Sequence, residues 1–63
     1  MIRYLLKRTD GRGGYVAPAG SARSYVHDTL KARRFPTIAA AEAERCPVNE
    51  TIVPVDIPFS ALA

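Results

Sequence analysis

Arginine is the residue of this 63-residue sequence with the clearest capacity for chemistry, because its planar fork of N–H donors pairs with phosphate or carboxylate groups. Arginines gather in the glycine-rich run RTDGRGGYVAPAGSARS, residues 8–24, and again ten residues later in the chain. We select six residues in and near these runs as a candidate surface for binding a partner. They are Arg12, Tyr15, Arg23, Lys31, Arg33 and Arg34. The alternative for the last three is a solvated helix end, where basic residues complement the helix dipole.

The glycines of DGRGG could cradle a phosphate or could turn a hairpin. A P-loop needs a lysine followed by serine or threonine at the start of a helix, and a dinucleotide fingerprint needs a third glycine that opens one. Here the glycines lead into Tyr15 and Val16, which favour a strand, and Asp10-Gly11 is a pair typical of tight turns. We therefore predict a hairpin. RGGYVA also resembles part of an RNA-recognition strand, but it lacks the first aromatic residue of that pattern, and only Tyr4 and Tyr15 could share a sheet face. Core packing is the alternative for both tyrosines.

The remaining reactive side chains are too few to build a catalytic or metal site. His27 is the single histidine and Cys46 the single cysteine, so a zinc site would lack at least two ligands and no disulfide can form within the chain. A nucleophilic Cys46 would also need a base and an orienting group, and the adjacency of His27 and Asp28 in sequence does not supply them. We predict a protein without enzymatic activity, metal or cofactor.

Three segments show the patterns of β-strands. IRYLLKR, residues 2–8, alternates with the period of two of a half-buried strand. Residues 15–17 resume an extended run, and residues 50–56 form a β-branched run typical of a third strand. Because Pro54 has no amide hydrogen, this strand is expected at an edge of the sheet.

Two segments show helix signals. We predict a short helix over residues 28–33, with Asp28 as a possible N-cap. The main helix is expected to follow Thr37 as its N-cap, to continue through the alanine-rich stretch to residue 46, and to end at Pro47.

These elements predict an α+β fold: a three-stranded antiparallel sheet with one main helix packed on one face, in the order strand, strand, short helix, helix, strand. Residues 1–56 would form a single domain, and residues 57–63 a C-terminal tail whose Phe59 and Leu62 either pack on the domain or fray. The expected core consists of ten residues. They are Ile2, Tyr4, Leu6, Val16, Leu30, Phe35, Ile38, Ala41, Ile52 and Val53.

The charge of the chain is polarised. Residues 1–35 hold eight basic and two acidic residues, a net charge of +6, whereas residues 36–63 hold one basic and four acidic residues, a net charge of −3. A basic half suits an acidic or nucleic-acid partner, and an uneven solvated surface is the alternative. The lone cysteine fits a reducing cytoplasm, and the opening MIRYLLKR lacks the apolar core of a signal peptide or membrane span.

Several short stretches resemble small proteins encoded by phages and prophages. They are an opening YLLK, then GGYVA, then ARRF followed by a threonine and the helix AAAEAE, and a closing ETIVPV. Some phage proteins of this size are anti-CRISPR inhibitors, so the resemblance implies a non-enzymatic protein that binds a host protein or nucleoprotein complex, such as a CRISPR effector. It would act in the cytoplasm of an infected or lysogenic bacterium, as a monomer or small homo-oligomer.

The alternative function is a small nucleic-acid-binding module that uses the same basic residues on phosphates. Such a module predicts steep salt dependence of binding, because each phosphate contact releases counterions. A protein partner would instead remain bound after nuclease treatment.

Overall fold

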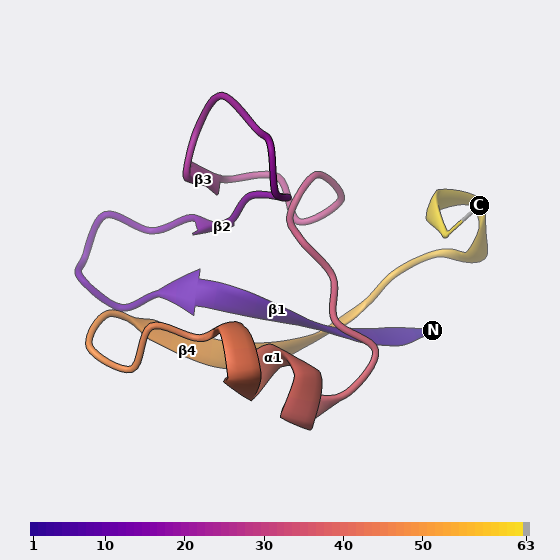
Figure 1. Cartoon of the computed structure of the whole chain (residues 1–63). Coiled ribbons are helices and arrows are strands. Elements are labelled where there is room, and N and C mark those ends of the chain that lie inside the picture. Colours follow the sequence, from indigo (N-terminus) through magenta and orange to yellow (C-terminus); the bar gives the residue numbers. More distant parts are fainter. Residues whose placement is uncertain (63) are drawn as a thin grey trace.

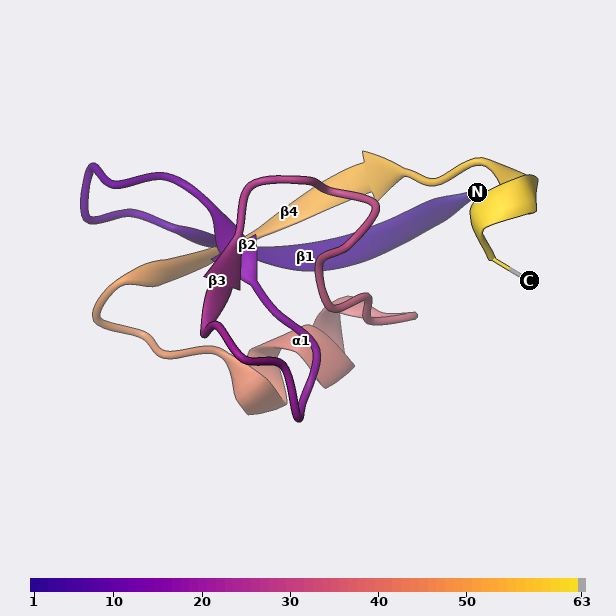
Figure 2. The same ribbon diagram turned by 90° about the horizontal axis from the view of Figure 1, so that it is seen from above.

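Four antiparallel strands form the sheet, in the order β3-β2-β1-β4 (Figure 1). The computed structural model describes residues 1–62. The strands are β1 (Ile2–Arg8), β2 (Tyr15–Val16), β3 (Tyr25–Val26) and β4 (Glu50–Asp56). Helix α1 (Ile38–Glu44) lies on one face of the sheet, and a short 3-10 helix, η1 (Phe59–Ala61), follows β4 (Figure 2). The predicted α+β class is confirmed, with four strands in place of three.

The long pair β1–β4 is the centre of the sheet and confirms both long strands with their predicted bounds. The register runs from Ile2 opposite Asp56 to Arg8 opposite Glu50. On the edge of β1 that faces away from β4, Tyr4 exchanges two backbone hydrogen bonds of 2.9 Å with Phe35.

Pro54 lies opposite Tyr4 in β4, and β4 is an outer strand. Because the N–H and C=O of Tyr4 point away from β4 toward Phe35, the nitrogen of Pro54 must point away from β1 as well. The missing amide hydrogen therefore costs no bond of the ladder. The predicted edge position of this strand is confirmed.

Strand β3 is the element that the sequence does not predict. Tyr25 and Val26 pair with β2, and beyond this pair the Ala17 amide donates to the Ser24 carbonyl at 2.9 Å. A strand of two residues is too short for an alternating pattern, which is why periodicity misses it. It extends the first hairpin into a three-stranded meander.

Helix α1 begins where predicted but ends earlier. The Thr37 hydroxyl accepts a hydrogen bond from the Ala40 amide at 3.1 Å, which confirms Thr37 as the N-cap. The helix ends at Glu44, not at residue 46, because Arg45 has an extended backbone with ψ of 136°. Its guanidinium binds Glu42 at 2.8 Å and the Glu50 carbonyl at 3.0 Å, which ties the helix end to the start of β4.

The predicted short helix over residues 28–33 is wrong. The Asp28 side chain accepts from the Leu30 amide at 2.9 Å and its carbonyl accepts from the Lys31 amide at 3.0 Å, which makes one turn. The Arg33 amide donates to the Val16 carbonyl of β2 at 2.9 Å and not to a carbonyl of a helix turn. The Asp28 side chain thus competes with helix carbonyls for the local amides, as aspartate does in loops. The segment that follows is hydrogen-bonded to the sheet.

The core covers both faces of β1, whereas the sequence analysis assigned one. On the helix face, Leu6 packs with Phe35 and Ala41. On the opposite face Leu5 is fully buried, and so is Ile57, whose amide donates to the Met1 carbonyl at 2.8 Å. Ala17 and Ala32 are also buried.

Three residues of the expected core are surface residues. Ile2, Leu30 and Ile38 are 48%, 46% and 56% exposed. Ile38 occupies the first position of α1, and Leu30 lies in the turn that replaces the predicted helix, so neither can reach the sheet core. In the predicted tail, Phe59 is 76% exposed, Leu62 is half-buried, and Ala63 lies outside the described residues.

Gly14 closes the hairpin between β1 and β2, and its replacement by alanine is expected to lower the free energy of unfolding by about 1–2 kcal/mol. Gly14 has φ of +94°, and an added Cβ would lie 3.4 Å from the Val26 carbonyl oxygen. Gly11→Ala is the matched control, because Gly11 has φ of +84° with no atom within 4 Å of the added carbon. Urea denaturation should show the larger loss for Gly14→Ala, and an unchanged midpoint for that variant would contradict the prediction.

Candidate functional site

A cavity of about 370 Å³ lies against β3, where three loops of the chain meet. The loops are residues 9–14, which join β1 to β2, residues 17–24, which join β2 to β3, and residues 27–37, which join β3 to α1 (Figure 1). Each loop contributes one basic side chain to the wall, and β1 contributes a fourth. These are Arg12, Arg23, Lys31 and Arg8.

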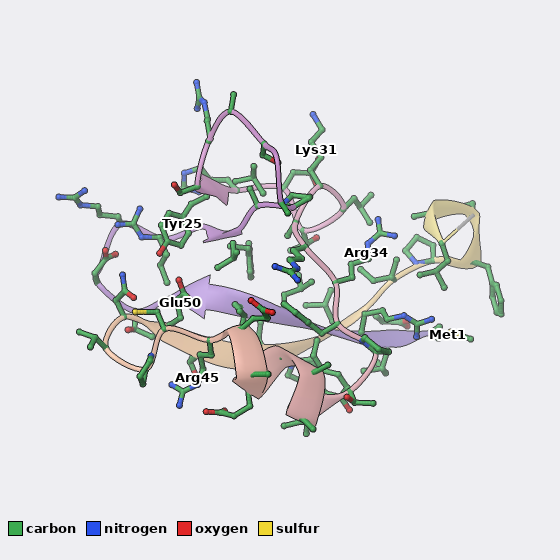
Figure 3. The ribbon with its side chains drawn as sticks, viewed as in Figure 1. Met1, Tyr25, Lys31, Arg34, Arg45 and Glu50 are labelled. Atoms are coloured by element: carbon green, nitrogen blue, oxygen red, sulfur yellow. The ribbon has the colours of Figure 1, made fainter. Side chains whose placement is uncertain are left out.

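Three of these cations make no ion pair within the described residues. In residues 1–62 no ion pair includes Arg12, Arg23 or Lys31, and no side-chain hydrogen bond of theirs is made. Figure 3 shows Lys31 and Tyr25 in the half of the molecule that holds β2 and β3, away from Arg45 beside α1. Arg12, Arg23 and Lys31 thus place three positive charges around one concave site, where an anion would be attracted from several sides.

Tyr25 forms part of the cavity wall and is held from two directions. Its hydroxyl donates to the Glu50 carboxylate at 2.8 Å, and the Arg8 guanidinium stacks over its ring, 4.2 Å from the centroid. Glu50 is 8% exposed, and its second oxygen accepts from the Cys46 amide at 2.9 Å. The hydrogen bond to Glu50, with burial, raises the pKa of Tyr25. These contacts fix the tyrosine before any ligand arrives.

Arg8 differs from the other three cations because Asp10 neutralises it. Its Nε donates to the Asp10 carboxylate at 3.2 Å, and its Nη2 donates to the same oxygen. This bond to Arg8, with a second from the Arg12 amide, lowers the pKa of Asp10, so the carboxylate is ionised at neutral pH. The cations left for a ligand are Arg12, Arg23 and Lys31, opposed by Asp28 in the same wall.

The His27 ring lies beside the hairpin glycines in the cavity wall. The His27 ring lies 3.8 Å from the position that a Cβ of Gly13 would occupy, and 3.7 Å from that of Gly14. A Cβ at either position would make an ordinary van der Waals contact with the ring, so the glycines are required for the positive φ of the turn and not for the placement of His27. The run DGRGG therefore turns the hairpin, as predicted, with the exposed His27 ring beside it at the cavity.

The structure brings together three of the six residues selected from the sequence, Arg12, Arg23 and Lys31. Arg33 and Arg34 are engaged elsewhere. The Arg33 guanidinium stacks over the Phe35 ring at 4.8 Å and lies 3.8 Å from the Glu44 carboxylate. Arg34 donates to the Leu30 and Ala61 carbonyls at 2.8 and 2.5 Å, which ties the C-terminal segment to the body.

Tyr15, the sixth selected residue, lies on the sheet face opposite Arg8 and α1. It is paired with Lys7, and directly paired residues share a face, whereas Tyr4 stands three positions from Lys7 and so faces the opposite side. Tyr4 and Tyr15 therefore do not share a face, which excludes the arrangement that the RNA-recognition pattern would need. The tyrosine on the same face as Arg8 is Tyr25, because it pairs with Val16 of the helix-facing core.

Six residues of the wall were not selected from the sequence: Arg8, Gly13, Tyr25, Val26, His27 and Asp28. Tyr25 and Val26 form β3, a two-residue strand that leaves no periodic signal, and His27 and Asp28 follow it directly. Arg8 and Gly13 line the cavity because they lie beside this segment. The one available signal is the excess of basic residues in the first half of the chain, which indicates that the site is positively charged but not which residues form it.

Comparisons with models of protein families, with curated proteins and with solved structures found no match to this chain. In residues 1–62 no group of three or more histidine, cysteine, aspartate or glutamate side chains is arranged to hold a metal ion. None of the helices described in that range has the length and apolar character needed to cross a membrane.

Proposed function

We propose that this protein is a non-enzymatic nucleic-acid-binding module that holds phosphate in the basic cavity. The observation that carries the proposal is the convergence of Arg12, Arg23 and Lys31, without counterions in residues 1–62, from three loops onto one cavity. Arginine and lysine supply most phosphate contacts in nucleic-acid complexes, and such contacts dominate the affinity.

The composition of the cavity favours phosphate over a protein surface. Protein interfaces depend on aromatic and apolar anchors that fill pockets at the centre of the contact. The aromatic residue of this wall, Tyr25, already has a ring face covered by Arg8 and its hydroxyl bound to Glu50. What the cavity offers a partner is mainly positive charge and hydrogen-bond donors.

The inhibitor function that the resemblance implies stays a prediction. Of the residues assigned to its contact surface, Arg33 and Arg34 already make contacts within the chain. An inhibitor that contacts a guide RNA in an effector complex would use the same cavity. Capture of effector subunits by the tagged protein from a nuclease-treated lysate of CRISPR-bearing bacteria would favour direct protein binding instead.

Neutralising the cavity cations one at a time is expected to weaken binding of short single-stranded DNA or RNA. Arg12→Gln, Arg23→Gln and Lys31→Gln should each reduce the affinity by roughly 3- to 10-fold at low salt, because each removes a cation that binds a phosphate. The slope of log affinity against log salt should fall by about 0.7 for each phosphate that a variant no longer neutralises. Isothermal titration calorimetry at several salt concentrations measures both quantities.

Lys7→Gln is the matched control for these variants. Lys7 is exposed, belongs to the same basic half, and sits on the sheet face opposite Arg8. Its substitution removes the same charge and should leave the affinity nearly unchanged. An equal loss for Lys7→Gln would mean that binding follows net charge, and no binding to any oligonucleotide at low salt would refute the proposed function.

A further inference from the structure

The arrangement of the cations differs from that of a track along a nucleic-acid backbone. Proteins that follow a single strand combine a long positively charged groove with aromatic platforms for successive bases. Here the cations stand on three loops around one site of about 370 Å³. That volume is in the lower part of the range of small-molecule sites, about 300–1,000 Å³. The cavity is therefore suited to one group of a ligand.

The charge of the site indicates which group. With Arg8 neutralised by Asp10, the wall holds Arg12, Arg23 and Lys31 against Asp28, three positive charges against one negative. An internal phosphodiester carries one negative charge, whereas a phosphate monoester carries about −1.5 to −2 at pH 7. The net charge of +2 therefore matches a monoester better than a diester.

The number of hydrogen-bond donors in the wall also favours a phosphate monoester. A phosphate monoester presents three strong acceptor oxygens, one more than an internal phosphodiester. Two arginines and one lysine line the cavity from separate loops, and their guanidinium and ammonium groups are donors that form charge-assisted hydrogen bonds with phosphate oxygens. The exposed His27 ring beside Gly13 adds a further donor or acceptor in the same wall.

The cavity offers little to a base. Arg8 occupies one face of the Tyr25 ring at 4.2 Å, and the bond to Glu50 fixes the ring in place. Stacking on aromatic rings is the main sequence-tolerant contact of unpaired bases. With one face of that ring covered by Arg8, less aromatic surface is left for a base to stack on.

We infer that the cavity binds a terminal phosphate, the phosphomonoester at the end of a nucleic-acid strand, in preference to internal phosphodiesters. This inference rests on the proposed function, because it takes the ligand to be a nucleic acid. A free mononucleotide carries the same chemical group, so the test includes it as a second source.

The test compares four unlabelled probes by calorimetry with the intact protein. They are one single-stranded DNA sequence with a 5′-phosphate, with a 3′-phosphate, and with hydroxyls at both ends, and a deoxynucleoside monophosphate. At least one phosphorylated strand should bind about tenfold more tightly than the hydroxyl strand, the effect of one additional charge-assisted hydrogen bond. Arg12→Gln, Arg23→Gln and Lys31→Gln should each reduce this preference, and Lys7→Gln should retain it.

The outcomes separate the two proposals. Equal affinity for phosphorylated and hydroxyl strands, with the cavity variants weakening both, would overturn the inference and leave the proposed function intact. A preference that survives all three cavity substitutions would also overturn it, because the phosphate would then bind elsewhere. Binding of the mononucleotide without binding of any strand would overturn the proposed function and support the phosphomonoester chemistry with a free nucleotide as its source. Binding of none of the four probes would overturn both.

Discussion

Replacing Leu6 with alanine is expected to lower the free energy of unfolding by about 2–5 kcal/mol. Leu6 is 1% exposed and packs with Phe35 and Ala41, so the substitution opens a void between the sheet and α1. A domain of 63 residues has about 3–9 kcal/mol of stability in total. Leu6→Ala should therefore lose a large part of the total stability, seen as lower thermal and urea midpoints in far-ultraviolet circular dichroism.

Leu30→Ala is the matched control for this prediction. It removes the same atoms from a side chain that is 46% exposed and lies in a surface turn. Its expected loss is below about 1 kcal/mol. Similar losses for the two variants would show that the cluster around Leu6 is not the core of the fold.

Replacing Glu50 with alanine is the second change with a large expected effect, about 2–4 kcal/mol. The buried carboxylate accepts from the Tyr25 hydroxyl at 2.8 Å and from the Cys46 amide at 2.9 Å. Alanine would leave both donors without their acceptor and would also free Tyr25 in the cavity wall. We expect Glu50→Ala to lower both the denaturation midpoint and the affinity for oligonucleotides.

Glu50→Gln separates the hydrogen bonds from the charge. Its amide oxygen can accept from the Cys46 amide while its amide nitrogen donates to the Tyr25 oxygen, so both groups keep a partner. Glu50→Gln should therefore retain most of the stability and affinity that Glu50→Ala loses. Equal losses for the two variants would show that the negative charge itself is required.

The same pair predicts a pH dependence. The hydrogen bond to Glu50 raises the pKa of Tyr25 above its ordinary value, so folding favours the protonated phenol. The resulting stability is fully present below the pKa of an unfolded tyrosine, about 10, and is lost as the pH rises through the raised value. Ultraviolet absorbance of tyrosinate should show one of the three tyrosines ionising late in the native protein and earlier in Glu50→Gln. Identical titrations would contradict the hydrogen bond between Tyr25 and Glu50.

The long elements of the fold are predictable from local patterns. The alternation of residues 2–8, the β-branched run at 50–56 and the Thr37 cap each lead to the observed strand or cap, because each signal lies within a few adjacent residues. The burial of Leu5 is not predictable in this way. It depends on the second face of the sheet being covered, which is a tertiary property.

Only the positive charge of the candidate site is predictable from the sequence. Arg12, Arg23 and Lys31 stand out as basic residues near glycines and turns, and the structure places them around one cavity. Nothing in the sequence distinguishes Arg34 from these residues, yet its guanidinium donates to two backbone carbonyls, a contact that no local pattern predicts. Long-range contacts of this kind decide which cations remain available for a ligand.

The most direct test of the central claim, that the basic cavity binds phosphate, is a titration of isotope-labelled protein with a 5′-phosphorylated single strand, followed by nuclear magnetic resonance. We expect the largest shifts at the backbone amides of Arg12, Gly13 and Lys31 and at the guanidinium Nε–H groups of Arg12 and Arg23, with little change at Lys7. Shifts centred on Lys7 and Tyr15, with the cavity signals unmoved, would contradict the account.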